Sequence, residues 1–311
     1  MGQKIEKTTP GLSLPAGKTA IPACPQTTIR NPIFCRGTGL HSGRDITLKL
    51  VPQPANSGIL FQRVDISHTP PFRLTPESLK GARLSTIIAD PDRPEIQIAT
   101  IEHLMASLHA LAIDNILIQL DGPETPIFDG SAQDFAFLLS CAGQKELPAP
   151  RRFIKILHPL IIRGENGAFV SLSASKKREF SLKMAIEFSE TVIGSQKIAF
   201  VLKREDFLKN IASSRTFVSR DEIETLHKQG LALGGSLENA LVVEGDHVLN
   251  PEGLRSADEF VRHKLLDAIG DSYCMGYQII GKFDGFKSGH ELNNRLIKAL
   301  AMHKETWQFI S

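Results

Sequence analysis

Polar and apolar residues each recur at three- and four-residue spacing along residues 259–271, and this pattern predicts one helix. At about 100° per residue, one side of this helix collects its apolar residues, which are Val261, Leu265, Leu266, Ala268 and Ile269. The other side holds His263, Lys264, Asp267 and Asp271. Side chains four residues apart are neighbours on a helix surface, so His263 and Asp267 can reach one cation. Many helices carry such a pair as an exposed hydrogen bond, so the spacing alone is a weak signal.

Earlier in the chain, short apolar or alternating runs between Gly, Pro and Asn predict strands at residues 46–51, 58–64, 96–99 and 115–120. A helix is expected between the last two strands, with Thr100 as its N-cap. Its apolar residues recur at helical spacing and predict a face buried on a sheet; they are Ile101, Leu104, Met105, Leu108 and Leu111. Residues 131–143 predict a second helix.

The same order of elements recurs after residues 145–153, which are the best candidate for a linker. His103 lies 27 residues before Gly130, and His263 lies 26 residues before Gly289. An internal duplication explains this match, although one such match can also arise by chance. We therefore expect an α+β fold of two related domains, residues 26–147 and 148–311, after a loose N-terminal extension at residues 1–25.

Composition narrows the classes of partner. With 41% hydrophobic and 23% charged residues, the chain is typical of a soluble globular protein. A formal net charge of +2 without a basic run argues against nucleic acid, and no apolar run is long enough to span a membrane. The four cysteines are scattered, which favours the reducing cytoplasm over a disulfide framework or a thiolate zinc site.

If the two domains pack helix against helix, His103 joins His263 and Asp267 around one cation. Three protein ligands leave one position for water, as in a catalytic zinc site. The imidazoles favour Zn²⁺ over Mg²⁺, and Fe²⁺ suits the same ligand set. A bound water then has its pKa lowered to about 7 and supplies hydroxide at neutral pH.

Four further polar residues could take part in this chemistry, and each has an ordinary alternative. Glu102 could act as general base. As a first-turn carboxylate it would gain about 0.3 to 1 kcal/mol from the helix dipole, and the sequence alone favours this second interpretation. His290 could protonate a leaving group or be a solvated loop residue. Lys264 could stabilise an oxyanion, and Asp271 could hold His290 protonated, or both could be surface charges.

The remaining seven histidines are interpreted as surface or packing residues, His41 and His109 among them. The segment GTGLHSG around His41 is a weak phosphate-loop candidate, because no Lys-Ser/Thr pair follows and a glycine turn explains it.

Six long segments, in this order, resemble one enzyme family: TIEHLMASLHALAIDN, PETPIFDGSA, SRTF, GLALGGSLENALVV, DEFVRHKLLDAIGD and KSGHELNN. The family is the UDP-3-O-acyl-N-acetylglucosamine deacetylases, zinc enzymes of the committed step of lipid A synthesis in Gram-negative bacteria. The resemblance runs from about Gln26 to about Phe309. It implies hydrolysis of the sugar's N-acetyl group to acetate and a free amine.

The resemblance also implies a role for each site residue. His103, His263 and Asp267 match the zinc ligands, Glu102 the general base, and His290 the general acid. The resemblance further implies that Asp271 is the charge partner of His290 and that Lys264 and Thr216 hold the oxyanion. It also implies that Phe217 lines the substrate site. It further implies two β-α-α-β domains with the active site between them.

The resemblance also implies an inserted element in the second domain that forms a tunnel for the acyl chain, which we expect at residues 221–243. Its candidate lining residues are Ile223, Leu226, Leu231, Leu233 and Leu237. Each buried methylene contributes about 0.8 kcal/mol, so a tunnel can measure chain length; alternatively, these leucines pack an ordinary core. The chain departs from the family pattern in its N-terminal extension, in residues 255–257 (Arg-Ser-Ala), and at Ser85, where a Cys is frequent. These departures leave the chemistry intact and bear on acyl selectivity.

The substrate would therefore be a UDP-linked, acylated amino-sugar, handled by a monomer without stable membrane insertion. Two rival functions remain. One is a zinc hydrolase of the same architecture that acts on another acylated amino-sugar. The other is a non-catalytic binding protein whose histidines are core groups, and metal content separates it from either hydrolase.

Overall fold

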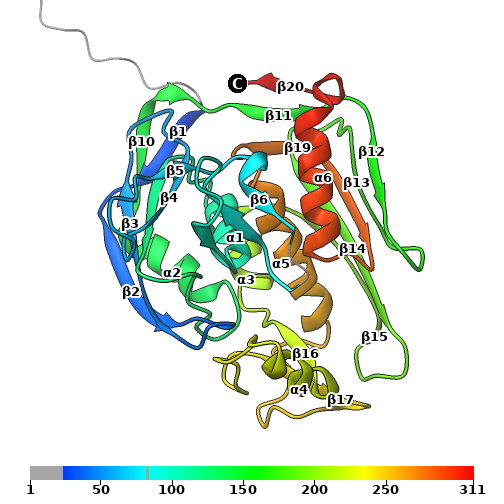
Figure 1. The fold of residues 1–311 in the computed structure, drawn as a ribbon. Helices are drawn as coiled ribbons and strands as arrows, with labels where there is room; N and C mark the ends of the chain where they lie inside the picture. The colour runs from blue at the N-terminus through cyan, green and yellow to red at the C-terminus, as the bar shows by residue number, and fades with distance from the viewer. Residues whose placement is uncertain (1–23, 82–83) are drawn as a thin grey trace, which may run out of the picture.

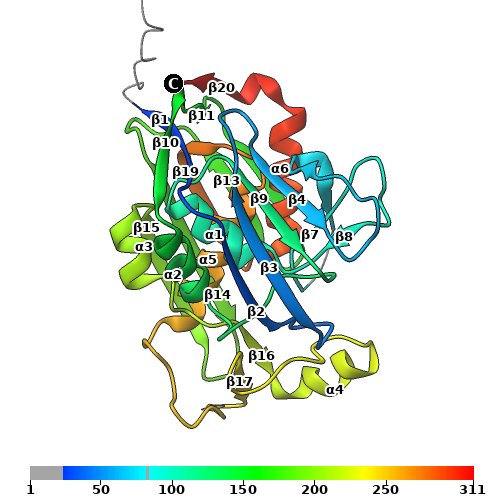
Figure 2. The same cartoon turned by 90° about the vertical axis from the view of Figure 1, so that its left-hand side faces the viewer.

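Two β-sheets enclose a layer of helices in the computed structural model, which describes residues 24–81 and 84–311 (Figures 1 and 2). The first sheet has the strand order β2 (Ile33–Thr38), β3 (Asp45–Pro52), β9 (Ile116–Leu120), β4 (Ile59–Arg63) and β5 (Phe72–Arg73). Helices α1 (Glu102–Ala110) and α2 (Gln133–Ala142) lie on its inner side. The mixed architecture agrees with the α+β class expected from the sequence.

The second sheet repeats this strand order. It runs β12 (Leu160–Arg163), β13 (Phe169–Ser173), β19 (Gln278–Phe286), β14 (Phe180–Phe188) and β15 (Gly194–Val201), with β11 (Phe153–Ile156) added beside β19 and β20 (Trp307–Ile310) beside β11. In both five-strand orders the third and fourth strands are parallel and the other neighbours are antiparallel. The added β11 is parallel to β19, and β20 is antiparallel to β11. Helices α5 (Glu259–Tyr273) and α6 (His290–Met302) belong to this half.

Smaller elements join these layers. Strands β1 (Pro25–Ile29) and β10 (Gln144–Pro150) pair with each other, as do β6 (Leu79–Lys80), β7 (Ile87–Ala89) and β8 (Gln97–Ile98). A separate lobe at the bottom of Figure 1 contains β16 (Phe217–Ser219), α4 (Arg220–Lys228), β17 (Leu241–Glu244) and β18 (His247–Val248). The remaining elements are α3 (Arg204–Asn210) and the 3₁₀ turns η1 (Pro76–Ser78) and η2 (Lys304–Thr306).

Alternation along the strands explains how each sheet acquires one buried face. Ile46, Leu48 and Leu50 of β3 are at most 1% exposed, while Asp45 and Lys49 point to solvent. The same two-residue period places Ile116, Ile118 and Leu120 of β9 in the core. The buried faces of the two sheets cover the helices from opposite sides.

Helices α1 and α5 form the centre of the molecule. Every residue of α1 is buried, and in α5 both the apolar side and the polar residues His263, Asp267 and Asp271 are buried. The sequence predicted the two sides of α5 but not this burial. The polar side is buried because it lies toward α1 and α6 and not toward solvent (Figure 1).

Gly270 lets these two helices approach closely. A Cβ atom at this position would lie 2.0 Å from the carbonyl oxygen of Glu102 and 3.1 Å from the amide nitrogen of Ala106. Both obstacles are backbone atoms that cannot rotate away. The helix crossing therefore requires glycine here.

We expect Gly270→Ala to lower the free energy of unfolding by about 1 to 3 kcal/mol, as overpacking of a close-packed core does. Gly81→Ala is the matched control, because a Cβ at Gly81 would meet nothing within 4 Å. Denaturant unfolding of both variants measures the difference. Equal stability of the two variants would contradict the helix contact described here.

Two local predictions differ from the structure. Thr100 is not the N-cap of α1: the cap is Ile101, and Thr100 has a positive φ of 59°. Its hydroxyl instead donates to Glu124 Oε2 at 3.2 Å, so a tertiary contact overrides the local capping preference. Residues 145–153, expected as a linker, contribute to β10, which pairs with β1, and then to β11 of the second sheet.

Most of the expected N-terminal extension, residues 1–23, lies outside the described residues. Within residues 24–81 and 84–311, no helix combines the length and the apolar character that a membrane crossing requires.

Candidate active site

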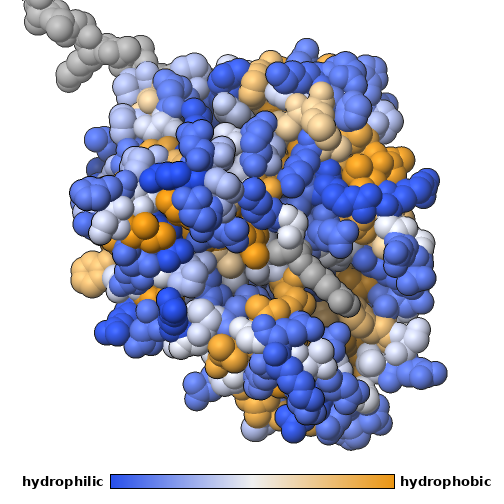
Figure 3. Space-filling view, in the orientation of Figure 1, coloured by the Kyte–Doolittle hydropathy of each residue, from blue (hydrophilic) through white to orange (hydrophobic). Residues whose placement is uncertain are grey.

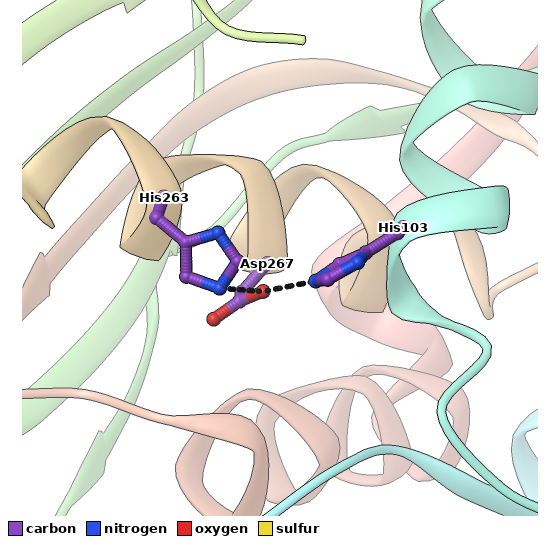
Figure 4. Close-up of side chains that lie close together, drawn as sticks. All are labelled: His103, His263 and Asp267. Atoms are coloured by element: carbon purple, nitrogen blue, oxygen red, sulfur yellow. Dashed lines mark ion pairs between the residues drawn. The ribbon is translucent and has the colours of Figure 1, made fainter. Parts of the chain in front are cut away.

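Three buried side chains from α1 and α5 converge on one point. His103 comes from α1, and His263 and Asp267 come from α5, and one potential ligand atom of each lies within 4.8 Å of the others (Figure 4). Asp267 Oδ1 is 3.4 Å from His263 Nε2 and 3.7 Å from His103 Nε2. The close contact at Gly270 sets this separation, because it fixes how near α5 lies to α1.

The hydrogen bonds around these groups leave lone pairs that face one another. His263 Nδ1 donates to the carbonyl oxygen of Ser214 at 3.0 Å, and burial lowers the pKa of His263 to about 3, so its Nε2 carries a lone pair. Asp267 Oδ1, which faces that lone pair, is buried without a hydrogen-bond partner among the described residues. A buried acceptor without a donor is costly, and a cation would satisfy all three groups.

The spacing also suits a metal ion. Tetrahedral Zn²⁺ with bonds of roughly 2.0 to 2.1 Å places its ligand atoms about 3.3 Å apart. The observed separations of 3.4 and 3.7 Å are close to this value. Two imidazoles and one carboxylate therefore fit a divalent cation with a fourth position open.

Glu102 and His290 lie beside this cluster. Glu102 Oε1 is 3.7 Å from His290 Nε2, which is also 3.7 Å from Asp267 Oδ2. Burial raises the pKa of the Glu102 carboxyl. Burial alone would lower the pKa of His290, but the carboxylates of Asp271, Glu102 and Asp267 outweigh it and raise the pKa to about 10. Asp271 Oδ2 accepts a hydrogen bond from His290 Nδ1 at 3.0 Å.

Lys264 and Phe217 border the cluster on the side of the lobe. The Lys264 ammonium donates to Asp267 Oδ2 at 3.0 Å and lies 5.3 Å from the centroid of the Phe217 ring. That ring lies 6.2 Å from the His263 ring. Thr216 directly precedes Phe217, and its amide donates to the carbonyl oxygen of Gly130 at 2.8 Å, which ties the lobe to the first half.

Two cavities lie between the lobe and the first half. One of about 380 Å³ is lined by Thr216, Phe217, Ile223, Leu226, Leu237 and, from the first half, His41. The other, of about 460 Å³, is lined by Leu226, Leu231, His41, Leu84 and Ser85. In Figure 3, apolar residues in orange gather where the lobe meets the rest of the molecule.

The structure brings nearly all the predicted site residues together. His103, His263, Asp267, Glu102, His290, Asp271 and Lys264 form one cluster, and Thr216, Phe217, Ile223 and Leu231 line the adjoining cavities. Leu233 is the exception: it is 55% exposed and is not among the described residues that line either cavity.

Comparison with known proteins shows the family to which the chain belongs. Residues 26–302 match the protein family described as UDP-3-O-acyl N-acetylglycosamine deacetylase. The chain belongs to this family. It is 45% identical over 288 residues to the UDP-3-O-acyl-N-acetylglucosamine deacetylase of Acidithiobacillus ferrooxidans (strain ATCC 53993 / BNL-5-31), a match that covers 92% of each chain. It is 41% identical to the enzymes of the same name from Shewanella baltica (strain OS155), with 92% of each chain covered, and Phenylobacterium zucineum (strain HLK1), with 91% of this chain and 95% of the relative covered.

In this member of the deacetylase family, sequence reasoning overlooked His41. It was interpreted as a surface or packing residue, yet it lines both cavities. Its Nδ1 accepts from the Ala232 amide at 3.4 Å, and its buried Nε2 has no partner among the described residues. The glycine turn around it was the available signal.

Arg215 was also overlooked. Its side chain is buried and donates to Glu259 Oε1 at 2.9 Å and to the carbonyl oxygen of Gly253 at 2.7 Å. Glu259 opens α5, so this pair fixes the segment that contains Ser214 and Thr216 against the helix that carries His263. A charged residue inside the SRTF motif was the available signal.

Proposed function

We propose that this protein removes the N-acetyl group of UDP-3-O-(3-hydroxyacyl)-N-acetylglucosamine by hydrolysis, releasing acetate and the free amine, in the committed step of lipid A biosynthesis. The observation that carries the proposal is the buried cluster of His103, His263 and Asp267 beside Glu102 and His290. Family membership supports the substrate class. The runner-up is a zinc amide hydrolase of the same architecture that acts on another acylated amino-sugar.

We further propose that His103, His263 and Asp267 hold Zn²⁺, with Fe²⁺ as the alternative that the same ligands allow. The orphaned oxygen of Asp267 and the neutral imidazole of His263 support a cation at this point. A bound metal would act as a Lewis acid that polarises the amide carbonyl and acidifies water.

The protein's own groups would then move the protons. Glu102, whose Oε1 faces the site, would take a proton from the attacking water as the carbon–oxygen bond forms. His290 would give its Nε2 proton to the amine nitrogen as the carbon–nitrogen bond breaks. Lys264 and Thr216 would donate hydrogen bonds to the oxyanion, and Asp271 would hold His290 in its charged form.

The proton transfers predict a bell-shaped dependence of kcat/KM on pH, with the alkaline limb set by the general acid. Asp271→Asn removes the nearest charge that raises the pKa of His290. The acid is active when protonated, so a lower pKa moves the alkaline limb toward lower pH. Rates measured across the pH range check this, and an unmoved alkaline limb would assign the acid to another group.

We propose that the acyl chain occupies the space between the lobe and the first half, with Phe217, Ile223 and Leu231 in contact with it. The cavity of about 380 Å³ is lined largely by apolar side chains, which supports an alkyl occupant. Leu233 was expected to join them; its exposed position suits the rim of this site better than its lining.

A deacetylation assay with UDP-sugars of graded acyl length, run together with zinc quantification, tests the proposed function. We expect about one equivalent of metal and a rate that rises to an optimum chain length, since each buried methylene contributes about 0.8 kcal/mol. UDP-N-acetylglucosamine without the acyl chain is the matched control. Equal rates with and without the chain would favour the runner-up, and absence of turnover on all of them would refute the proposal.

The remaining expectations from the sequence are also proposals. The shared strand order of the two sheets supports a duplicated pair of β-α-α-β domains at residues 26–147 and 148–311, packed helix to helix with the site between them. The four free cysteines support a cytoplasmic location. We propose a monomer that acts without stable membrane insertion and without nucleic acid.

A further inference from the structure

Thr86 lies at the boundary between the two halves, directly before β7, and none of its surface is exposed. Its hydroxyl donates a hydrogen bond of 2.5 Å to Asp271 Oδ1 on α5. Hydrogen bonds of this length between a hydroxyl and a carboxylate belong to the strong, charge-assisted class. Thr86 therefore contacts the second half through the residue that pairs with His290.

The backbone of the same residue contacts the first half. The Thr86 amide donates to Glu102 Oε2 at 3.0 Å, which leaves Glu102 Oε1 facing His290 Nε2. One buried residue thus holds the carboxylate proposed as the base and the carboxylate that orients the proposed acid. The two partners come from α1 and α5.

The donors around Asp271 show why the hydroxyl matters. Asp271 Oδ2 accepts from His290 Nδ1 at 3.0 Å and from Asn293 Nδ2 at 2.8 Å, and Oδ1 accepts from Thr86. Asn294 Nδ2 donates to the Thr86 oxygen at 3.4 Å, so the single hydroxyl hydrogen is directed at Asp271. Without it, Oδ1 would lose its donor and the carboxylate could turn away from the His290 ring.

We propose that Thr86 is a positioning residue that aligns the acid and the base for the two proton transfers, an inference that rests on the proposed function. Its hydroxyl fixes the Asp271 carboxylate and through it the His290 ring, while its amide fixes Glu102. Because none of the Thr86 surface is exposed, its hydroxyl cannot touch the substrate, so we expect it to act on turnover and not on binding.

Steady-state kinetics of the zinc-loaded full chain test this inference. We expect Thr86→Val to lower kcat roughly 10- to 100-fold, as loss of a hydrogen bond to a charged group does, with KM changed less than about threefold. Thr86→Ser keeps the hydroxyl and should restore kcat to within about threefold of the wild type. Thr306→Val is the matched control: it removes a threonine hydroxyl that donates to the His303 carbonyl at 2.6 Å near the chain end, and it should leave kcat unchanged.

A double-mutant cycle adds a second test, and Thr86→Ala replaces Thr86→Val there if the valine variant folds poorly. If the hydroxyl acts through Asp271, removing it from an Asp271→Ala variant should lower kcat by less than about a further threefold. The inference would be overturned if Thr86→Val had the kcat of the wild type, or if Thr86→Ser lost as much kcat as Thr86→Val. Loss of zinc from the valine variant, or effects on kcat that are fully additive in the cycle, would also overturn it. An inactive wild type would instead refute the proposed function.

Discussion

Replacing Asp267 by alanine is expected to release the metal and to lower kcat/KM by more than about 1000-fold. Asp267 Oδ1 faces both imidazoles, at 3.4 and 3.7 Å, so its removal takes away the charge that brings a cation to them. The substitution also leaves the Lys264 ammonium without its partner at 3.0 Å. Metal analysis of the purified variant, together with the deacetylation assay, measures both losses.

Asp258→Ala is the matched control on the same helix. Asp258 is the N-cap of α5 and pairs with Arg262 at 2.6 Å, away from the cluster. We expect this variant to keep its metal and its activity. Full activity of any metal-free sample, including wild type stripped by a chelator, would refute the mechanism.

The pair His263 and Asp267 could be predicted from the sequence because its geometry is local. Helical periodicity alone places residues four apart on one side of α5. Periodicity could not tell whether that side faces water or protein. The structure shows that it faces protein, because α1 packs against α5 in a contact that depends on the absence of a side chain at Gly270.

Glu102 illustrates how two interpretations can both hold. The sequence favoured a first-turn carboxylate stabilised by the helix dipole, and Glu102 is indeed the first residue of α1. The same carboxylate is only 3% exposed and faces His290 at 3.7 Å. A helix start can therefore supply a favourable position for the buried carboxylate that we propose as the general base.

Thr86 could not have been found from sequence patterns. Its two acceptors, Glu102 and Asp271, are 16 and 185 positions away. No periodicity or motif relates a residue before a short strand to a helix so distant in sequence. The prediction of Thr100 as an N-cap was wrong for a similar reason, since its hydroxyl bonds to Glu124 and not to the helix it precedes.

Glu102→Ala is expected to keep the metal and to lower kcat roughly 100- to 10,000-fold, which is the contribution typical of general acid–base catalysis. Glu102 is not one of the three groups that face the cation position, so zinc content should stay near one equivalent. The loss should fall mainly on kcat, because a base acts in the transition state more than in binding.

Glu102→Gln separates the charge from the shape. Glutamine retains an oxygen that can accept from the Thr86 amide, as Glu102 Oε2 does at 3.0 Å, but it cannot take up a proton from water. If Glu102 acts as base, the glutamine variant should be nearly as slow as the alanine variant while unfolding at close to the wild-type temperature. Loss of zinc from either variant would instead place Glu102 among the metal ligands, and near-normal turnover in the glutamine variant would assign proton removal to another group.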